Sequence, residues 1–417
     1  MDRLTRPCVV SVLMVAAATG FGCSERARAI QRESELKQVV QQMMAPVERA
    51  TGLTFKRQPI VLQRTRAQVR DYVVHKSDHD MPPAEIDGMQ AAYRLFGLLP
   101  DSVDLRRTVI DLLTEQVAGY YDADSNALFI PTDIDPAQAR LVVSHELVHA
   151  LQAQYVDLDS LIHQDRQNDR RSAAQAILEG QATLAQILVL MPEQNVDSLP
   201  DFWELRDALG KQQAQMTVFA NAPVWLRESL IFPYLGGAEF VRRFQHLHPD
   251  KQPFGALMPV STEQILHIDR YEAGDRPQVL AFVRPARDSV IYENDLGEFE
   301  TRLLLEQLLG NTATATALAA GWDGDRYQIL GPGAGALVWY SVWDDAATAD
   351  RFAAGLKRAW ALRRIPGQAE RRSEIVRLPL GGLPVVRLVD APLQWDGWTH
   401  IPTVRAVPVS PLHARPR

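Results

Sequence analysis

The segment LVVSHELVHALQ, residues 141–152, carries two histidines and a glutamate within an otherwise apolar run. Asp135 and Pro136 precede it, and an N-cap residue followed by proline at the first helical position predicts that a helix begins there. Residues four apart lie on the same face of a helix, so His145 and His149 point toward a common position. Because burial of imidazoles without partners costs on the order of several kcal/mol, the fold must provide a partner for both.

A metal ion is one such partner. Two imidazoles at this spacing match two ligands of a tetrahedral zinc site. Glu146 is rotated by about 100 degrees from His145, which puts its carboxylate beside the metal rather than on it. Zinc lowers the pKa of bound water to about 7, and a neighbouring carboxylate can then act as a general base. The alternative is that all three are ordinary helix residues, since the same pattern also occurs on helices that bind nothing.

A catalytic zinc site needs a third protein ligand, and Glu179 is the candidate. It is the one formal charge in the apolar run AAQAILEGQATLAQILVLM, which predicts a second helix. An isolated carboxylate there is costly unless it is paired or bound to a metal. The alternative is an ion pair with Arg170 or Arg171. Gly180 and Ala182 are small, so we expect this helix to approach the histidine helix closely.

His145, Glu146 and His149, with a glutamate on a following helix, resemble the gluzincin zinc metallopeptidases. The chain is also similar to a little-characterised group of bacterial and archaeal exported proteins that are predicted to be metallopeptidases. The similar segments are EQVAGYYD (residues 115–122), SHELVHALQ (144–152), LEGQAT (178–183), FPY (232–234), STEQILH (261–267) and GWDGDR (321–326). The resemblance implies His145, His149 and Glu179 as ligands of Zn2+, with Glu146 as general base and later proton donor.

The gluzincin resemblance also implies features around the zinc site. The strand predicted at residues 128–130 would line the cleft and pair with an extended substrate through its edge. A histidine or tyrosine would stabilise the oxyanion, and His267 and Tyr234 are the candidates. Ser261 and Gln264 also match a capping box, so His267 has a purely structural alternative. Where some gluzincins have an aspartate that orients a histidine ligand, this chain has Thr183.

The N-terminus has the features of an export signal. A short basic region and an apolar run lead to Cys23, which predicts a lipoprotein-type signal peptide over residues 1–23 and a lipid anchor at that cysteine. The lipobox is partial, because Gly20 stands where a leucine-like residue is usual, and cleavage after Ala29 is the alternative. We therefore expect an exported, membrane-anchored lipoprotein that faces the periplasm or the cell exterior.

Charge and hydrophobicity limit the other classes of function. The formal net charge is −7 and the basic residues are scattered among acidic ones, so nucleic acid is not expected as a partner. The expected partner is a protein or peptide substrate. Asp122, Asp124 and Asn126 match the first ligand positions of a calcium loop, but Ala127 replaces the required glycine, so a plain turn is favoured.

We expect an α+β fold with two parts. A mainly helical, zincin-like catalytic domain with a small sheet would span residues 24–285, and a smaller α+β subdomain with a proline-rich tail would span residues 286–417. KSDHDMPP is predicted to be a loop and residues 205–219 a helix. The function expected from these features is an exported zinc metallopeptidase. The alternatives are a cell-envelope binding or assembly lipoprotein with a structural or vestigial zinc site, and a hydrolase acting on something other than protein.

Overall fold

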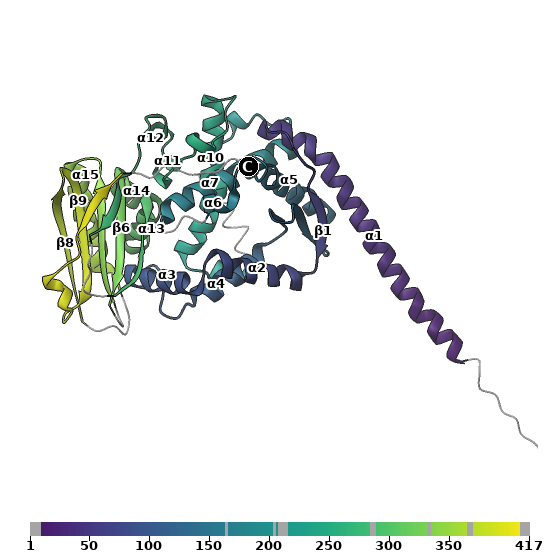
Figure 1. Ribbon diagram of the computed structural model, residues 1–417, viewed down its shortest axis with the longest axis horizontal. Coiled ribbons are helices and arrows are strands. Elements are labelled where there is room, and N and C mark those ends of the chain that lie inside the picture. The colour runs from purple at the N-terminus through teal and green to yellow at the C-terminus, as the bar shows by residue number, and fades with distance from the viewer. Residues whose placement is uncertain are drawn as a thin grey trace, which may run out of the picture.

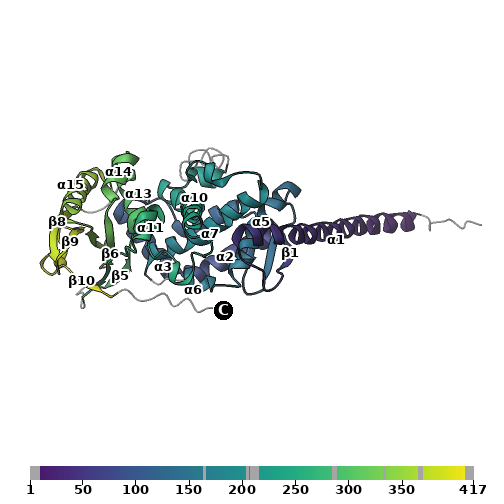
Figure 2. The same cartoon turned by 90° about the horizontal axis from the view of Figure 1, so that it is seen from above.

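The computed structural model describes residues 10–162, 166–202, 206, 216–283, 289–331, 335–364 and 370–408, with side chains from residue 31 onward except at position 136. The fold is mixed α+β, as the sequence predicts. A mainly helical N-terminal part contains a small sheet, and a C-terminal region contains a five-stranded antiparallel sheet. The long helix α1 projects from one end of the molecule, and the five-stranded sheet lies at the opposite end (Figures 1 and 2).

The N-terminal part is built mostly from helices around one three-stranded sheet. Its elements are α1 (Val10–Thr51), β1 (Ile60–Arg64), α2 (Arg66–Asp80), α3 (Pro83–Phe96), α4 (Leu105–Gln116), β2 (Tyr120–Asp122), β3 (Ala127–Pro131), α5 (Pro136–Gln152), α6 (Leu158–Ile162), α7 (Asn168–Leu190), η1 (Val196–Ser198), α9 (Thr217–Asn221), α10 (Val224–Leu247), η3 (Gly255–Leu257), α11 (Thr262–Leu266) and α12 (Ile268–Glu272).

The loop predicted for KSDHDMPP is wrong except at Met81 and Pro82, because α2 continues to Asp80 and α3 begins at Pro83. Thr65 and Gln68 form a capping box that starts this helix. Lys76 and Asp80 form an i,i+4 ion pair at 3.0 Å near its end. The helix stops only where Pro82 approaches. Most of the helix predicted at 205–219 lies outside the described residues, and α9 covers its last part.

A tight turn joins β2 to β3, in agreement with the preference for a turn over a calcium loop. The Asp122 carboxylate accepts hydrogen bonds from the backbone N–H and the hydroxyl of Ser125. Asn126 has a positive φ of 48°, a conformation that asparagine tolerates in turns.

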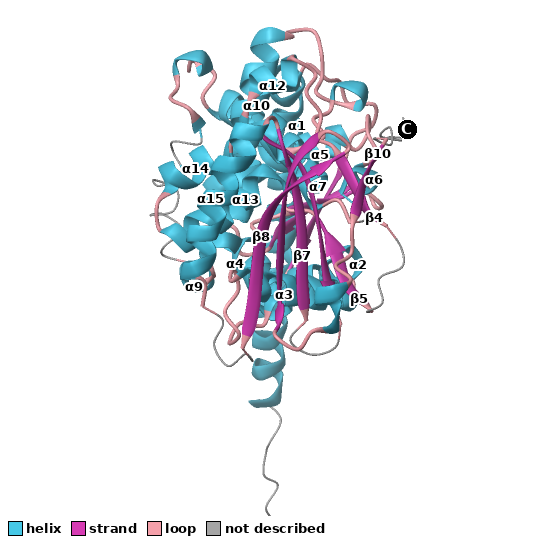
Figure 3. Cartoon of the chain, turned by 90° about the vertical axis from the view of Figure 1, so that its left-hand side faces the viewer, coloured by secondary structure: helices cyan, strands magenta, loops and turns pink. Residues whose placement is uncertain are grey.

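The C-terminal region packs helices on one face of its sheet. Its elements are β4 (Val279–Phe282), β5 (Val290–Asn294), α13 (Gly297–Leu309), α14 (Thr312–Ala319), β6 (Trp322–Leu330), β7 (Ala336–Trp343), α15 (Ala346–Leu362), β8 (Arg371–Leu380), β9 (Leu383–Pro392), η4 (Asp396–Thr399) and β10 (Val404–Val407). The strand order is β5-β6-β7-β9-β8, and all pairs are antiparallel. Figure 3 shows α13, α14 and α15 beside this sheet.

The central strand β7 alternates between two cores, as a strand buried on both faces must. Trp339 and Trp343 face the main core, which also contains α3 and helices α13 to α15. Val338, Tyr340 and Val342 face a second core, which is closed by the two-stranded β4–β10 ribbon.

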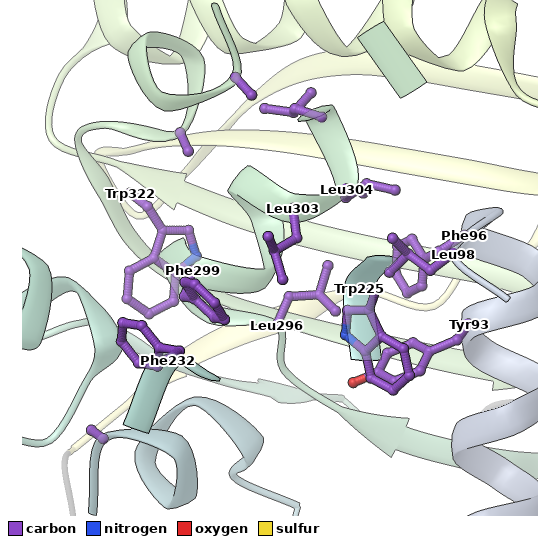
Figure 4. Packing of buried hydrophobic residues seen from close by; sticks show 14 of the residues in the cluster. Tyr93, Phe96, Leu98, Trp225, Phe232, Leu296, Phe299, Leu303, Leu304 and Trp322 are labelled. Carbon is purple, nitrogen blue, oxygen red and sulfur yellow. The ribbon is translucent and has the colours of Figure 1, made fainter. Parts of the chain in front are cut away.

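The main core joins the two parts of the chain. Phe232 of α10 stacks on Phe299 of α13 with ring centroids 4.0 Å apart (Figure 4). Phe96 of α3 meets Tyr327 of β6 edge to face at 5.2 Å. These contacts between aromatic rings hold α10, which also carries Tyr234, and α3 against the C-terminal region.

Among the described residues, α7 is the one helix long and apolar enough to cross a membrane by length and composition. More than half of it is buried inside the fold, where it packs against α5 and α10. We therefore interpret α7 as a core helix.

Candidate metal centre

Helix α5 presents both histidines at its buried face. Asp135 caps the helix by accepting the Ala137 N–H at 2.8 Å. Val143, Leu147 and Val148 are fully buried in the core that α5 shares with α1 and α7. Burial of these apolar side chains fixes the rotation of α5 about its axis. It therefore also fixes the direction in which the two imidazoles point.

Glu179 of α7 meets the two imidazoles. Its Oε2 lies 3.1 Å from Nε2 of His145 and 3.4 Å from Nε2 of His149, and the two Nε2 atoms are 3.2 Å apart. Zinc–ligand bonds of about 2.0 Å at tetrahedral angles separate ligand atoms by about 3.3 Å. The three side chains therefore form a group that could hold a metal ion. Neither Arg170 nor Arg171 takes this carboxylate, because they bond to Gln167 and Asn168.

The charges of the group reinforce one another. Burial would raise the pKa of Glu179, but the nearby imidazoles outweigh it and the net pKa falls well below the usual range. Burial would lower the pKa of His149, but Glu179 outweighs it and raises this pKa to about 9. A carboxylate that stays ionised beside two nitrogen donors suits a divalent cation, which would displace the protons held there.

Glu146 lies beside the triad and is 9% exposed. Burial raises the pKa of its carboxyl, and the two histidines offset part of that increase. The backbone N–H of Tyr121 in β2 donates a hydrogen bond to it. The Glu146 carboxylate therefore lies next to the three potential ligands and is not one of them. Its position one residue after His145 on the helix predicts this arrangement.

Gln152 orients His149, and sequence reasoning missed it. The Gln152 amide nitrogen donates to the Leu178 carbonyl and to Oε1 of Gln181, both at 3.0 Å. Its oxygen must therefore accept from Nδ1–H of His149, at 2.9 Å. This tautomer leaves the Nε2 lone pair free for a metal ion.

The amide chain continues beyond Gln152. Gln181 donates to Gln252 at 2.8 Å, and Gln252 donates to the carbonyl of Thr51 at the end of α1. Some gluzincins orient a histidine ligand with an aspartate at the position where this chain has Thr183. Here the neutral amide of Gln152 takes that role for His149. The available sequence signal was the position of Gln152, three residues after His149 on the same helix.

Tyr234 reaches the triad from α10. Its ring stacks beside that of His145 with centroids 6.0 Å apart. The charge of Glu179, then burial, and also a hydrogen bond to that carboxylate raise the Tyr234 pKa well above its usual value. The residue as a whole is 42% exposed, so Tyr234 lies at the protein surface while its hydroxyl contacts Glu179.

The close approach of α7 and α10 explains how Tyr234 gets there. A Cβ atom added to Gly180 would lie 2.1 Å from the carbonyl carbon of Gly237, and one added to Gly237 would lie 1.9 Å from the carbonyl oxygen of Ala176. The expectation that Gly180 lets α7 approach the histidine helix is therefore wrong, since Gly180 faces α10. Ala182 faces the core shared with α5.

The structure does not bring His267 into the triad. Its Nε2 lies 2.9 Å from Oε1 of Glu298 on α13. Ser261 caps α11 by accepting the Gln264 N–H at 3.2 Å, which confirms the helix start of the structural alternative. The capping box is incomplete, because the Gln264 side chain accepts the N–H of Val260 instead of that of Ser261. Of the two candidates for the oxyanion residue, Tyr234 is therefore the one beside the possible ligands.

The expected substrate strand is also corrected. β3 is the middle strand of its sheet, paired in parallel with β1 and antiparallel with β2, so both of its edges are used. The strand at the sheet edge nearest α5 is β2. Its outward-pointing Tyr121 N–H bonds to Glu146, so this edge faces the candidate site.

Comparison with known proteins identifies only part of the chain. A family model described as a domain of unknown function (DUF8575) matches residues 288–390, which run from just before β5 into β9 and contain none of the triad residues. No curated protein and no solved structure matched the chain.

Proposed function

We propose that this chain is a zinc-dependent metallopeptidase that hydrolyses peptide bonds. The observation that supports it most is the triangle of His145, His149 and Glu179, with sides of 3.1–3.4 Å, beside the buried carboxylate of Glu146. The donor set of two nitrogens and one oxygen is the set that catalytic zinc sites use, with a further position left for the reactants. A zinc ion bound there would supply Lewis-acid polarisation of a carbonyl and a nucleophile at neutral pH.

The side chains around the triangle divide the remaining tasks. Glu146, with a pKa raised by burial, would accept a proton on its carboxylate and return it to the leaving amine. Tyr234 would turn its hydroxyl from Glu179 to the developing oxyanion. The half-buried outer edge of β2, which is the edge strand of its sheet, would pair with an extended peptide and set its direction across the site.

We also propose that the protein is exported and anchored in a membrane through a lipid on Cys23, with the catalytic part facing the periplasm or cell exterior. The basic and apolar residues before Cys23 support this localisation.

The decisive experiment compares Glu146→Gln with the wild-type protein in zinc content and in digestion of a peptide library. The variant should retain zinc, because Glu146 is not a ligand, and lose hydrolysis by a factor of about 10² or more, the size expected for loss of a general base. His145→Ala should lose both zinc and activity. Glu193→Gln, an exposed change of the same type just after α7, should lose neither.

Equal turnover by Glu146→Gln would rule out the mechanism, and normal zinc content in His145→Ala would rule out the ligand assignment. Zinc bound by His145 and His149 in a wild-type protein that cleaves no peptide would favour the alternative, an envelope binding or assembly protein with a structural zinc site.

A further inference from the structure

Two segments that the triad does not use, STEQILH and GWDGDR, come together near the first residues of α7, where the Thr262 N–H donates to Asp169. Glu263 of α11, Asp275 after α12 and Asp344 after β7 have carboxylate oxygens that all lie within 4.8 Å of one another. Gly321 permits this approach. It has a φ of +83°, its carbonyl accepts the Asp344 N–H at 2.9 Å, and a Cβ there would lie 3.1 Å from an Asp344 oxygen.

Glu263 is the unusual member of this carboxylate cluster. It is 2% exposed, and its carboxylate accepts no hydrogen bond and forms no ion pair within the part of the chain that the structure describes. Two neighbouring buried carboxylates behave differently. Asp325 accepts the N–H groups of Leu296 and Gly297, and Asp169 accepts that of Thr262. A buried carboxylate with no donor costs several kcal/mol unless a cation compensates it.

Protein cations compensate only part of the cluster. Arg270 contacts Asp275 at 2.8 Å and also contacts Asp344, but it makes no ion pair with Glu263. Asp323 of β6 adds a further negative charge close to Asp275 and Asp344. Burial, followed by the charges of Glu298 and Asp275, raises the pKa of Glu263 to about 9. The negative charges of the cluster thus repel one another. The Arg270 guanidinium pairs with Asp275 and Asp344 only.

We propose that Glu263, Asp275 and Asp344 bind a calcium ion. An all-oxygen set of carboxylates suits a hard cation, and calcium tolerates the irregular geometry of ligands drawn from three separate segments. The Asp275 and Asp344 side chains are 33% and 27% exposed, so the ion can enter from solvent and keep water ligands. The bound ion would tie α11 and α12 to the end of β7, and so clamp the helical part to the C-terminal sheet.

The test is a calorimetric titration of Ca2+ into zinc-loaded protein, with thermal unfolding followed in parallel. The wild type should bind one calcium with a Kd on the order of 10⁻⁴ to 10⁻³ M, the range of weak calcium modules, and its Tm should rise with calcium concentration. Glu263→Gln should lose binding about tenfold or more, and Asp344→Asn, at an accessible position, should do the same.

Glu272→Gln is the matched control, because Glu272 lies on α12 beside Arg270 but pairs with His248 outside the cluster. It should bind calcium like the wild type. In calcium-free buffer near neutral pH, Glu263→Gln should unfold at a higher temperature than the wild type, because the buried Glu263 carboxyl, with its pKa raised to about 9, must take up a proton on folding and the neutral amide need not. The proposal is overturned if the wild type takes up no calcium and its Tm does not move, or if Glu263→Gln and Asp344→Asn both bind as the wild type does. Either result can be obtained whether or not the protein cleaves peptides.

Discussion

Replacement of Gln152 by leucine would remove the amide that orients His149 while keeping a side chain of similar size. Gln152 is fully buried and bonds to His149, the Leu178 carbonyl and Gln181. In the variant, Nδ1–H of His149 loses its acceptor, so the tautomer with a free Nε2 is no longer favoured. The triangle of potential ligands should then be less well formed before zinc arrives.

The expected losses of zinc affinity and of stability follow from the hydrogen bonds that Gln152 makes. Loss of a group that orients a metal-bound histidine typically weakens metal binding by about 10- to 100-fold, which is about 1.4–2.7 kcal/mol. The free energy of unfolding should also fall by about 1–3 kcal/mol, because Oε1 of Gln181 and Nδ1–H of His149 are left buried without partners.

The assay is a zinc titration against a competing chelator, with denaturant unfolding measured on the same samples. Gln154→Leu is the control for stability. Gln154 is 6% exposed, lies two residues after the end of the same helix, and bonds to residues 56 and 57 rather than to an imidazole. It should lose stability and keep wild-type zinc affinity. Unchanged zinc affinity in Gln152→Leu would refute the assignment of Gln152 as the orienting group.

Three further predictions concern packing, pH and anchoring. Gly180→Ala should force α7 and α10 apart by about 1 Å, since the new Cβ would lie 2.1 Å from Gly237, at a cost of about 1–3 kcal/mol; unchanged denaturant unfolding would contradict this packing. Burial raises the pKa of Glu300 from 4.5 to about 7 in the folded protein, so its stabilising contribution is complete below pH 4.5 and is lost as the pH rises to 7. Glu300→Gln should therefore be more stable than the wild type by up to about 3 kcal/mol at pH 8 and gain nothing at pH 4.5, and parallel unfolding curves at both pH values would contradict it. Cys23→Ser should release the exported protein from membranes on cell fractionation, and unchanged membrane association would rule out the lipid anchor.

The triad was predictable because its signals are local. His145 and His149 lie on one helix at a spacing that converges by itself, and Glu179 is the one charge in an apolar helix. Burial of an imidazole or a carboxylate without a partner is costly, so the sequence also predicted that the histidines of one helix and the glutamate of the other would lie together.

The neighbours of the triad were not predictable in the same way. Gln152, Gln181 and Gln252 carry no charge, so burial alone gives no reason to single them out. Their hydrogen bonds depend on how α5, α7 and the segment after α10 pack. The expectation that residues 128–130 form a strand with a free edge failed for a related reason, because the parallel pairing of β1 with β3 joins residues more than 60 positions apart and leaves no periodic signal.

The two candidate metal centres are connected through α7. The first residues of this helix are held by the bond between Asp169 and the N–H of Thr262, which is adjacent to Glu263. Glu179 follows Asp169 on the same unbroken helix, about 15 Å further along its axis. A cation at Glu263 would therefore influence the histidine centre by holding the start of α7 against α11, without any contact with the imidazoles. Calcium should consequently raise the stability of the protein more than it changes zinc affinity, because a continuous helix transmits position but adds no ligand.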